Sequence, residues 1–340
     1  MSPILKYTAA LLPTLPYTLA QTYTNCNPLE KTCSSDTGST QSTLHYNFVE
    51  SSSTLAEWTI LSGNPTISSE GVELTINQQG DAPTIETPYY IFFGEVSVVM
   101  KASAGTGIIS SIVLESDDLD EVDWEVLGSY TTELQTDYFG KGDSSTSNRW
   151  TWEPIDDPQF TFHNYTLTWT PESLTWSIDG TATRTLSYSD AANGTRYPQT
   201  PMQVRIGIWA GGDPDNNQGT IDWAGGETDY SQAPFTMVVR SVDIVNYYPA
   251  ESYTYSDKSG SFESIVMQGG KVSSLPASAD ASGSGSGSTT TAGVAPATAS
   301  IQWAGASRPG CIQLNVPVLG FSVSIWGLCI LFLAPRVLAI

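Results

Sequence analysis

The chain has 340 residues and a strong acidic excess, with 35 Asp and Glu against 13 Lys and Arg and a formal net charge of −22. This charge argues against nucleic acid as a partner. Two histidines, His45 and His163, and four cysteines at unrelated spacings offer no zinc site, and we expect no metal or other cofactor. The 10 Trp and 16 Tyr suit a neutral polysaccharide, although any single aromatic is more often a core residue.

The first segment predicts secretion. Lys6 precedes an apolar stretch from Tyr7 to Leu19, and the small residue Ala20 follows, where a signal peptidase could cut. Two prolines interrupt the stretch and weaken the pattern. We expect residues 1–20 to be a signal peptide.

Residues 21–265 have the length of one all-β domain. Short β-branched and aromatic runs alternate with clusters of Gly, Pro, Asn and Asp, and helical periodicity is scarce. The expected strands are Gly94 to Ala102, Gly107 to Leu114, Tyr165 to Trp169, Leu174 to Ile178, Val204 to Trp209 and Phe235 to Val245. We predict an all-β sandwich of two antiparallel sheets.

Acidic and apolar residues alternate strictly between positions 121 and 126. In a β-strand this pattern puts three acids on one face and three apolar residues on the other. The acids are Glu121, Asp123 and Glu125, and the apolar residues are Val122, Trp124 and Val126. Neighbouring like charges raise one another's pKa, so such a row has an electrostatic cost that catalysis would explain.

Three interpretations of this acid row stay open. It could be a solvated outer face, or a calcium site, although it lacks the Gly turn and closing Glu of the helix-loop-helix type. It could also serve retaining glycoside hydrolysis, with one nucleophile, one acid/base and a third acid that tunes them. On a straight strand the Cα atoms of Glu121 and Glu125 would lie roughly 13 Å apart. Retaining enzymes have their two catalytic carboxyl groups about 5–5.5 Å apart, so this interpretation predicts a twisted, concave strand.

The end of the chain predicts a stalk and a lipid anchor. Residues 266–305 include a run of Ser, Gly, Thr and Ala that cannot form a core, and we expect a flexible, O-glycosylated stalk. The small triplet Gly305-Ala306-Ser307, a polar spacer and an apolar stretch from Val316 to Ala334 resemble a glycosylphosphatidylinositol attachment signal. We expect residues 306–340 to be removed as a propeptide. A retained transmembrane helix, with Arg336 beyond it, is the alternative.

Cysteines and glycosylation acceptors fit secretion. Removal of the tail discards two cysteines and leaves Cys26 and Cys33, whose short separation predicts a disulfide. Asn164 and Asn193 each begin an Asn-X-Thr acceptor triplet.

Several motifs resemble family 16 glycoside hydrolases, and in particular their fungal Crh branch. The first is the active-site strand Glu121-Val122-Asp123-Trp124-Glu125. The others follow in matching order over roughly residues 24 to 265. They are Cys26-Asn27-Pro28-Leu29 with Cys33, Tyr138-Phe139-Gly140-Lys141-Gly142, His163-Asn164-Tyr165-Thr166, Trp176-Ser177-Ile178-Asp179-Gly180, Arg205-Ile206-Gly207-Ile208-Trp209 and Gly219-Thr220-Ile221-Asp222-Trp223-Ala224-Gly225-Gly226.

The resemblance implies a β-jelly-roll with a concave substrate cleft. It makes Glu121 the nucleophile and Glu125 the acid/base, and it gives Asp123 a hydrogen bond to the nucleophile. The residues expected to line sugar subsites are Arg205, Trp209, Thr220, Tyr138 and Lys141, with Trp209 as a stacking platform. For Arg205, a structural ion pair is the alternative in so acidic a chain.

The function implied is a cell-wall transglycosylase that cuts chitin and joins it to β-glucan or chitin through a covalent glycosyl-enzyme. Chitin, β-glucan and a lipid anchor are thus the expected partners, at the cell wall or the outer face of the plasma membrane. Two alternatives remain: a retaining hydrolase of the same fold, in which water replaces the acceptor sugar, and a wall-anchored carbohydrate-binding module without catalysis.

Overall fold

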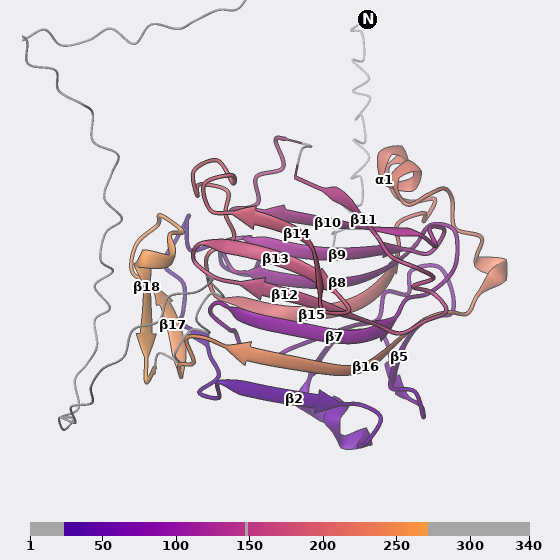
Figure 1. Ribbon diagram of the computed structural model, residues 1–340, viewed down its shortest axis with the longest axis horizontal. Helices are drawn as coiled ribbons and strands as arrows, with labels where there is room; N and C mark the ends of the chain where they lie inside the picture. The colour runs from indigo at the N-terminus through magenta and orange to yellow at the C-terminus, as the bar shows by residue number, and fades with distance from the viewer. Residues whose placement is uncertain (1–23, 147–148, 271–340) are drawn as a thin grey trace, which may run out of the picture. The chain divides into compact units, whose positions relative to one another are not determined.

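A computed structural model describes residues 24–146 and 149–270, all within one compact unit. Two large antiparallel sheets are stacked as layers, and a small third sheet stands beside them (Figure 1). The described part of the chain is nearly all β-structure. Its one α-helix is α1 (Gln218–Trp223), and its 3₁₀ turns are η1 (Ser52–Glu57), η2 (Tyr230–Gln232) and η3 (Phe262–Ser264).

The first large sheet has seven strands. In spatial order they are β11 (Thr151–Pro154), β10 (Glu133–Phe139), β9 (Glu121–Leu127), β8 (Ile108–Ser116), β15 (Met202–Ala210), β6 (Thr84–Glu86) and β3 (Thr59–Ser62). The acidic stretch therefore forms β9, with a strand on each side. Register aligns Asp123 with Val113 of β8 and with Asp137 of β10.

The second large sheet has eight strands. The main path runs β14 (Thr181–Ser187), β13 (Ser173–Ile178), β12 (His163–Trp169), β7 (Gly94–Lys101), β16 (Phe235–Asn246), β5 (Val72–Ile76) and β4 (Thr66–Ile67). The eighth strand, β2 (Thr43–Asn47), pairs with the second half of β16. The small sheet has the order β1 (Asp36–Thr37), β17 (Ser252–Tyr255) and β18 (Ile265–Gln268).

The core lies between the two large sheets and is rich in aromatic side chains. Trp124 of β9 is fully buried and packs edge-on against Tyr165 of β12, with ring centroids 5.5 Å apart. Trp176 of β13 is also buried, and its indole N–H donates to the backbone carbonyl of Asp123 at 3.2 Å. Burial of each such side chain contributes roughly 1.5–3 kcal/mol or more. The second sheet thus holds the acidic strand by packing and by a hydrogen bond to its backbone.

The predicted fold is confirmed: the chain forms an all-β jelly-roll sandwich of two antiparallel sheets. Each of the six expected strands is present, as β7, β8, β12, β13, β15 and β16, with ends that differ by at most a few residues. The last strand, β18, continues past position 265 to Gln268, so the folded part extends beyond the expected boundary. The expected signal peptide, the attachment propeptide and nearly all of the stalk lie outside the described residues. Within residues 24–146 and 149–270, no helix is long and apolar enough to cross a membrane.

Candidate active site

Strand β9 has two chemically different faces. Val122, Trp124 and Val126 are fully buried against the second sheet. The acid row, defined as Glu121, Asp123 and Glu125, points to the opposite face of the seven-stranded sheet. Glu121 and Glu125 are half-buried, and Asp123 is only 3% exposed. This arrangement is the alternation expected from the sequence, and it leaves two of the three carboxyl groups within reach of a ligand.

The three carboxyl groups interact with one another. Asp123 shares a hydrogen bond with Glu121, and this bond favours the ionised form of Glu121. Burial, followed by the charges of neighbouring acids, raises the pKa of Asp123 well above its usual range. The same causes raise the pKa of Glu125 well above its usual range. Asp123 and Glu125 therefore hold protons more firmly than an ordinary carboxyl group.

The surroundings of the two glutamates separate their roles. Burial and the charge of Asp137 also raise the pKa of Glu121, but the hydrogen bond from Asp123 and the charge of Arg149 oppose that rise. Two interactions thus favour the ionised form of Glu121, whereas burial and the neighbouring acids all favour the protonated form of Glu125. An ionised carboxylate can act as nucleophile, and a protonated one can act as general acid.

A fourth acid, Asp137 of β10, joins this face, and the sequence analysis missed it. It lies directly opposite Asp123 in the strand register and is 9% exposed. Arg149 lies beside it, with Nε 3.7 Å from Oδ1 of Asp137. The guanidinium of Arg149 also stacks on the ring of Phe139, at 4.1 Å from its centroid. The alternation of residues 133 to 139 was the available signal, since it puts Asp137 on the face of Gln135 and Phe139.

Arg205 of β15 lies in the same row of residues across the sheet as Asp123. Its side chain is buried and makes ion pairs with Glu86 of β6 and Glu115 of β8. The structure therefore contains the ion pair that the sequence analysis set against a sugar contact. Arg205 fixes two acids on the face that carries the acid row, where it could also donate to a hydroxyl group.

Aromatic rings lie near the Glu125 end of the acid row. Trp209 of β15 stacks on Trp223 of α1, with ring centroids 5.8 Å apart and an interplanar angle of 24°. Trp223 donates from its indole N–H to the side-chain oxygen of Gln135, which is paired with Glu125 in the strand register. Because Trp223 stacks against one face of Trp209, that face cannot contact a sugar ring.

A second aromatic pair lies on the other side of β9. Tyr130 stacks on Trp152 of β11, with centroids 5.2 Å apart and an interplanar angle of 25°. Both rings are partly buried and pack on the same small cluster, centred on Ile109, Leu127 and Ala224, as the Trp209 pair. Such flat rings can stack on pyranose rings. The sequence analysis did not single out this pair.

Three other expected sugar ligands occupy different positions. Thr220 lies on α1, one turn before Trp223, and its side chain is half-buried. Tyr138 is paired with Val122 and is therefore on the core-facing side of β10, where Arg184 stands over its ring. Lys141 follows β10, and its Nζ lies 3.8 Å from a carboxyl oxygen of Asp120. The structure thus brings Thr220 near the aromatic end of the site and separates Tyr138 and Lys141 from the acid row.

The acids just before the acid row belong to a buried turn. Asp120 accepts hydrogen bonds from the backbone N–H groups of Lys141 and Gln199, at 2.9 and 2.8 Å, and from the hydroxyl of Thr200 at 3.0 Å. Asp118 accepts from Ser116 at 2.6 Å and lies 2.6 Å from the hydroxyl of Thr200, whose single proton it shares with Asp120. These turn acids, Asp117, Asp118 and Asp120, tie the β8–β9 connection to distant loops.

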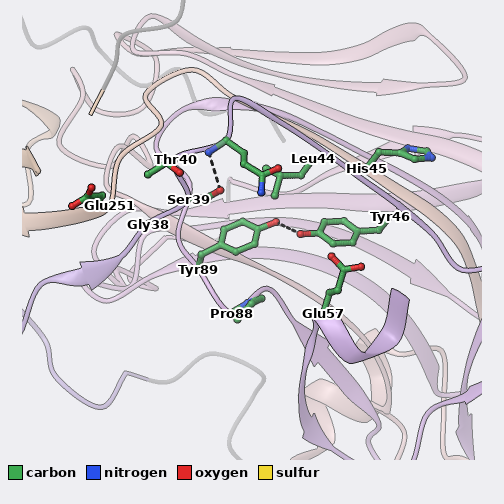
Figure 2. Close-up of a pocket in the computed structure, with 11 residues that line it drawn as sticks. Gly38, Ser39, Thr40, Leu44, His45, Tyr46, Glu57, Pro88, Tyr89 and Glu251 are labelled. Atoms are coloured by element: carbon green, nitrogen blue, oxygen red, sulfur yellow. Dashed lines mark hydrogen bonds between the residues drawn. The ribbon is translucent and has the colours of Figure 1, made fainter. Parts of the chain in front are cut away.

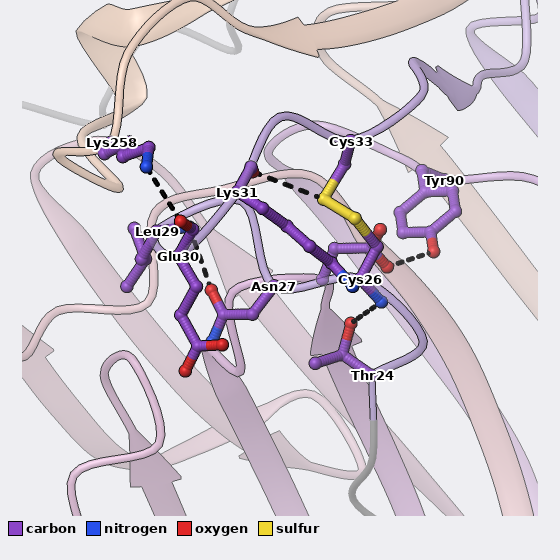
Figure 3. Close-up of a disulfide and its surroundings, with 10 residues drawn as sticks. Thr24, Cys26, Asn27, Leu29, Glu30, Lys31, Cys33, Tyr90 and Lys258 are labelled. Carbon is purple, nitrogen blue, oxygen red and sulfur yellow. Dashed lines mark hydrogen bonds between the residues drawn. A yellow bond between two sulfur atoms is a disulfide. The ribbon is translucent and has the colours of Figure 1, made fainter.

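The disulfide Cys26–Cys33 closes a loop beside this turn, with Cα atoms 5.9 Å apart (Figure 3). The hydroxyl of Tyr90, near the disulfide in the figure, donates to Asp117 at 2.7 Å. The N-terminal loop thus lies near Tyr90, which contacts the turn before the acidic strand (Figure 3). The two glycosylation acceptors lie elsewhere: Asn164 is half-buried on β12, and Asn193 lies in an exposed turn.

A cavity of about 550 Å³ lies apart from the acid row (Figure 2). Residues of β2, η1 and the segment after β6 are among those that line it. The lining includes the tyrosine pair Tyr46 and Tyr89, whose hydroxyl oxygens are 2.7 Å apart. None of the site residues expected from the sequence lines it. Among the described residues, no group of three or more His, Cys, Asp or Glu has a geometry that could hold a metal ion.

An acid row on the outer face of a jelly-roll sheet, with aromatic rings beside it, is a site for glycoside chemistry. The sequence profile of glycosyl hydrolases family 16 matches residues 53–225. Crh-like protein 5 of Aspergillus fumigatus is 58% identical over 265 residues, which make up 78% of this chain and 67% of that protein.

Solved structures agree with this match. A structure titled Crh5 transglycosylase in complex with NAG has 58% sequence identity and a TM-score of 0.70, and the match covers 72% of this chain and 100% of that chain. The β-glucanase of Bacillus licheniformis has a TM-score of 0.51 at 22% identity, covering 61% of this chain and 99% of that chain, and shows the fold alone. The chain belongs to glycosyl hydrolases family 16, among relatives named Crh-like proteins, and is an enzyme that acts on glycosides.

Proposed function

We propose that this protein cuts chitin and transfers the released chain to β-glucan or to another chitin chain in the cell wall. The acid row carries this proposal, because Glu121 and Glu125 share one face of β9 with Asp123 hydrogen-bonded to Glu121. The match to a transglycosylase solved with NAG supports a donor built from N-acetylglucosamine.

The reaction has two steps with the same two glutamates. Glu121 bonds to the anomeric carbon while the glycosidic bond breaks, and Glu125 gives its proton to the leaving oxygen. Glu125, now a carboxylate, then takes the proton of an acceptor hydroxyl group. The oxygen of that acceptor attacks the anomeric carbon and releases Glu121. Asp123 stabilises the charge on Glu121 before and after the covalent intermediate.

Sugar rings would be held by aromatic faces and by hydrogen bonds. Trp209, backed by Trp223, and the Tyr130–Trp152 pair offer flat surfaces on either side of β9. Arg205 on β15 and Thr220 on α1 offer hydrogen-bond donors. For Tyr138 and Lys141 we propose an indirect role, since their positions favour support of β10 over contact with a sugar.

The location follows from the ends of the sequence. We propose that residues 1–20 direct secretion and that residues 306–340 are replaced by a glycosylphosphatidylinositol anchor, with residues 266–305 as the stalk. Asn164 and Asn193 would carry glycans. Release of the protein from cells by a phosphatidylinositol-specific phospholipase tests the anchor, and a peptide containing Arg336 in the mature protein would contradict it.

A transfer assay tests the activity. The secreted protein is incubated with a chitin oligosaccharide and a fluorescent β-1,3-glucan oligosaccharide, and the products are separated by size. We expect a fluorescent product longer than the acceptor, absent with Glu121→Gln. Shortened chitin without a longer fluorescent product would indicate a hydrolase. Binding without any product would indicate a carbohydrate-binding module.

A further inference from the structure

Asp137 and Asp123 form a pair of carboxyl groups on adjacent strands. The register places them directly opposite each other on β10 and β9. Cβ atoms of such pairs lie about 4.5–5.5 Å apart, and two like charges there are destabilising. A proton on one of the two groups removes this repulsion.

The surroundings decide which group is ionised. Asp137 receives the backbone N–H of Tyr138 at 2.8 Å and has Arg149 at 3.7 Å. Burial raises the pKa of Asp137 above its usual range, and the backbone N–H of Tyr138 and the charges of Arg149 and Arg184, from β14, oppose this rise. Each of these interactions stabilises a carboxylate on Asp137.

Asp123 has the opposite surroundings. Its Oδ1 is buried and finds no hydrogen-bond partner among the described residues. The charged groups that act on it are Glu121, Glu125 and Asp137, and all three are acids. A proton on Asp123 removes this repulsion and can be donated to Glu121.

We propose that Asp137, held by Arg149, is a positioning residue of the reaction: its carboxylate keeps Asp123 protonated, so that Asp123 donates a hydrogen bond to Glu121. The inference rests on the proposed roles of Glu121 and Glu125. The charge of Asp137 also acts directly on Glu125, and it helps this general acid to keep its proton as the pH rises. Asp137 thus links one ion pair to the charge state of the whole acid row.

The test is a pH profile of kcat/KM for two variants with opposite charge changes. Asp137→Asn removes a negative charge, so Glu125 should lose its proton more readily and the alkaline limb should move to lower pH by roughly half a unit or more. Arg149→Gln removes a positive charge and should move the same limb to higher pH. For Asp137→Asn we expect kcat to fall roughly tenfold with KM nearly unchanged, because the interaction acts on the reacting groups.

Two control variants separate this role from a structural one. Arg149→Lys keeps the charge and should keep the wild-type limb, although it loses the fork geometry of the guanidinium. Asp137→Glu should recover the limb position at least in part. The inference would be overturned if Asp137→Asn and Arg149→Gln moved the alkaline limb of the kcat/KM profile in the same direction. It would also be overturned if the folded Asp137→Asn protein kept the wild-type limb. If Asp137→Asn does not fold, the direction in which Arg149→Gln moves the alkaline limb still tests the inference. If the wild-type protein forms no transfer product, the proposed function itself is refuted.

Discussion

The turn acids and the acid row stand next to each other in the sequence but have different surroundings. Asp120 is surrounded by donors, two backbone N–H groups and one hydroxyl, which come from loops far along the chain. In the acid row, Oδ1 of Asp123 and Oε2 of Glu125 are buried and have no hydrogen-bond partner among the described residues. Burial raises pKa values in both groups, so the difference between Asp120 and the acid row lies in the hydrogen bonds: donors from distant loops hold Asp120 in the fold, whereas the unpartnered oxygens of Asp123 and Glu125 are available for proton transfer.

Removal of either catalytic carboxyl group should have the largest effect. Glu121→Gln removes the nucleophile and should abolish transfer to within the limit of detection. Glu125→Gln removes the general acid and should lower kcat by roughly 100- to 10,000-fold. The unfolding midpoint of both variants should stay near wild type, because these side chains lie on the outer face. The control is Glu172→Gln, an exposed acid in the turn between β12 and β13. Near-normal turnover in either catalytic variant would refute the assignment.

The two faces of β9 should respond differently to loss of an indole. Trp124→Ala empties a fully buried site and should lower the free energy of unfolding by roughly 3–5 kcal/mol. Trp209→Ala should mainly raise KM for chitin oligosaccharide, although loss of its contact with Trp223 adds a smaller decrease in stability. Thermal midpoints and turnover, measured for both variants, test this difference between the two faces. The opposite result, with Trp124→Ala stable and unable to bind, would place the acid row in the core.

Changes in the turn acids should affect stability more than chemistry. Asp120→Asn puts an amide N–H₂ group against donors and leaves at least one of them unsatisfied, at a cost of about 2 kcal/mol. We expect the thermal midpoint to fall by roughly 5 °C, while kcat of the folded protein changes little. A large loss of kcat without a change in the midpoint would remove the distinction between the turn acids and the acid row.

A further expected effect is a dependence of stability on pH. Burial raises the pKa of Asp36, which neighbours Asp117, to about 8, and raises that of Asp120 to about 7. In the pH range between the unfolded and folded pKa values, the native state holds protons that the unfolded chain has lost. Stability therefore falls as the pH rises from about 4 toward 8. Thermal midpoints measured across this range should decrease, and Asp36→Asn should flatten the decrease. A midpoint that rises with pH would contradict these shifts.

The local pattern of the sequence determined the strands and the two faces of β9. Alternation of acidic and apolar residues is a property of neighbouring positions, and a β-strand converts it directly into two faces. The same reasoning predicted the strand at residues 235 to 245 and the other five, because β-branched and aromatic runs between turn residues are also local. Sequence separation alone brought Cys26 and Cys33 within reach of each other.

Only the tertiary structure decided which acids are free and which are held. The donors to Asp120 come from Lys141, Gln199 and Thr200, and the order of strands in the sheet brings Asp137 beside Asp123. Tyr138 and Lys141 matched a motif, but strand register and the buried turn moved them away from the acid row. Pairing between distant segments depends on topology and register, and a pKa depends on the charges and donors that this pairing collects. The sequence therefore identified the acid row, and the fold determined the surroundings in which it works.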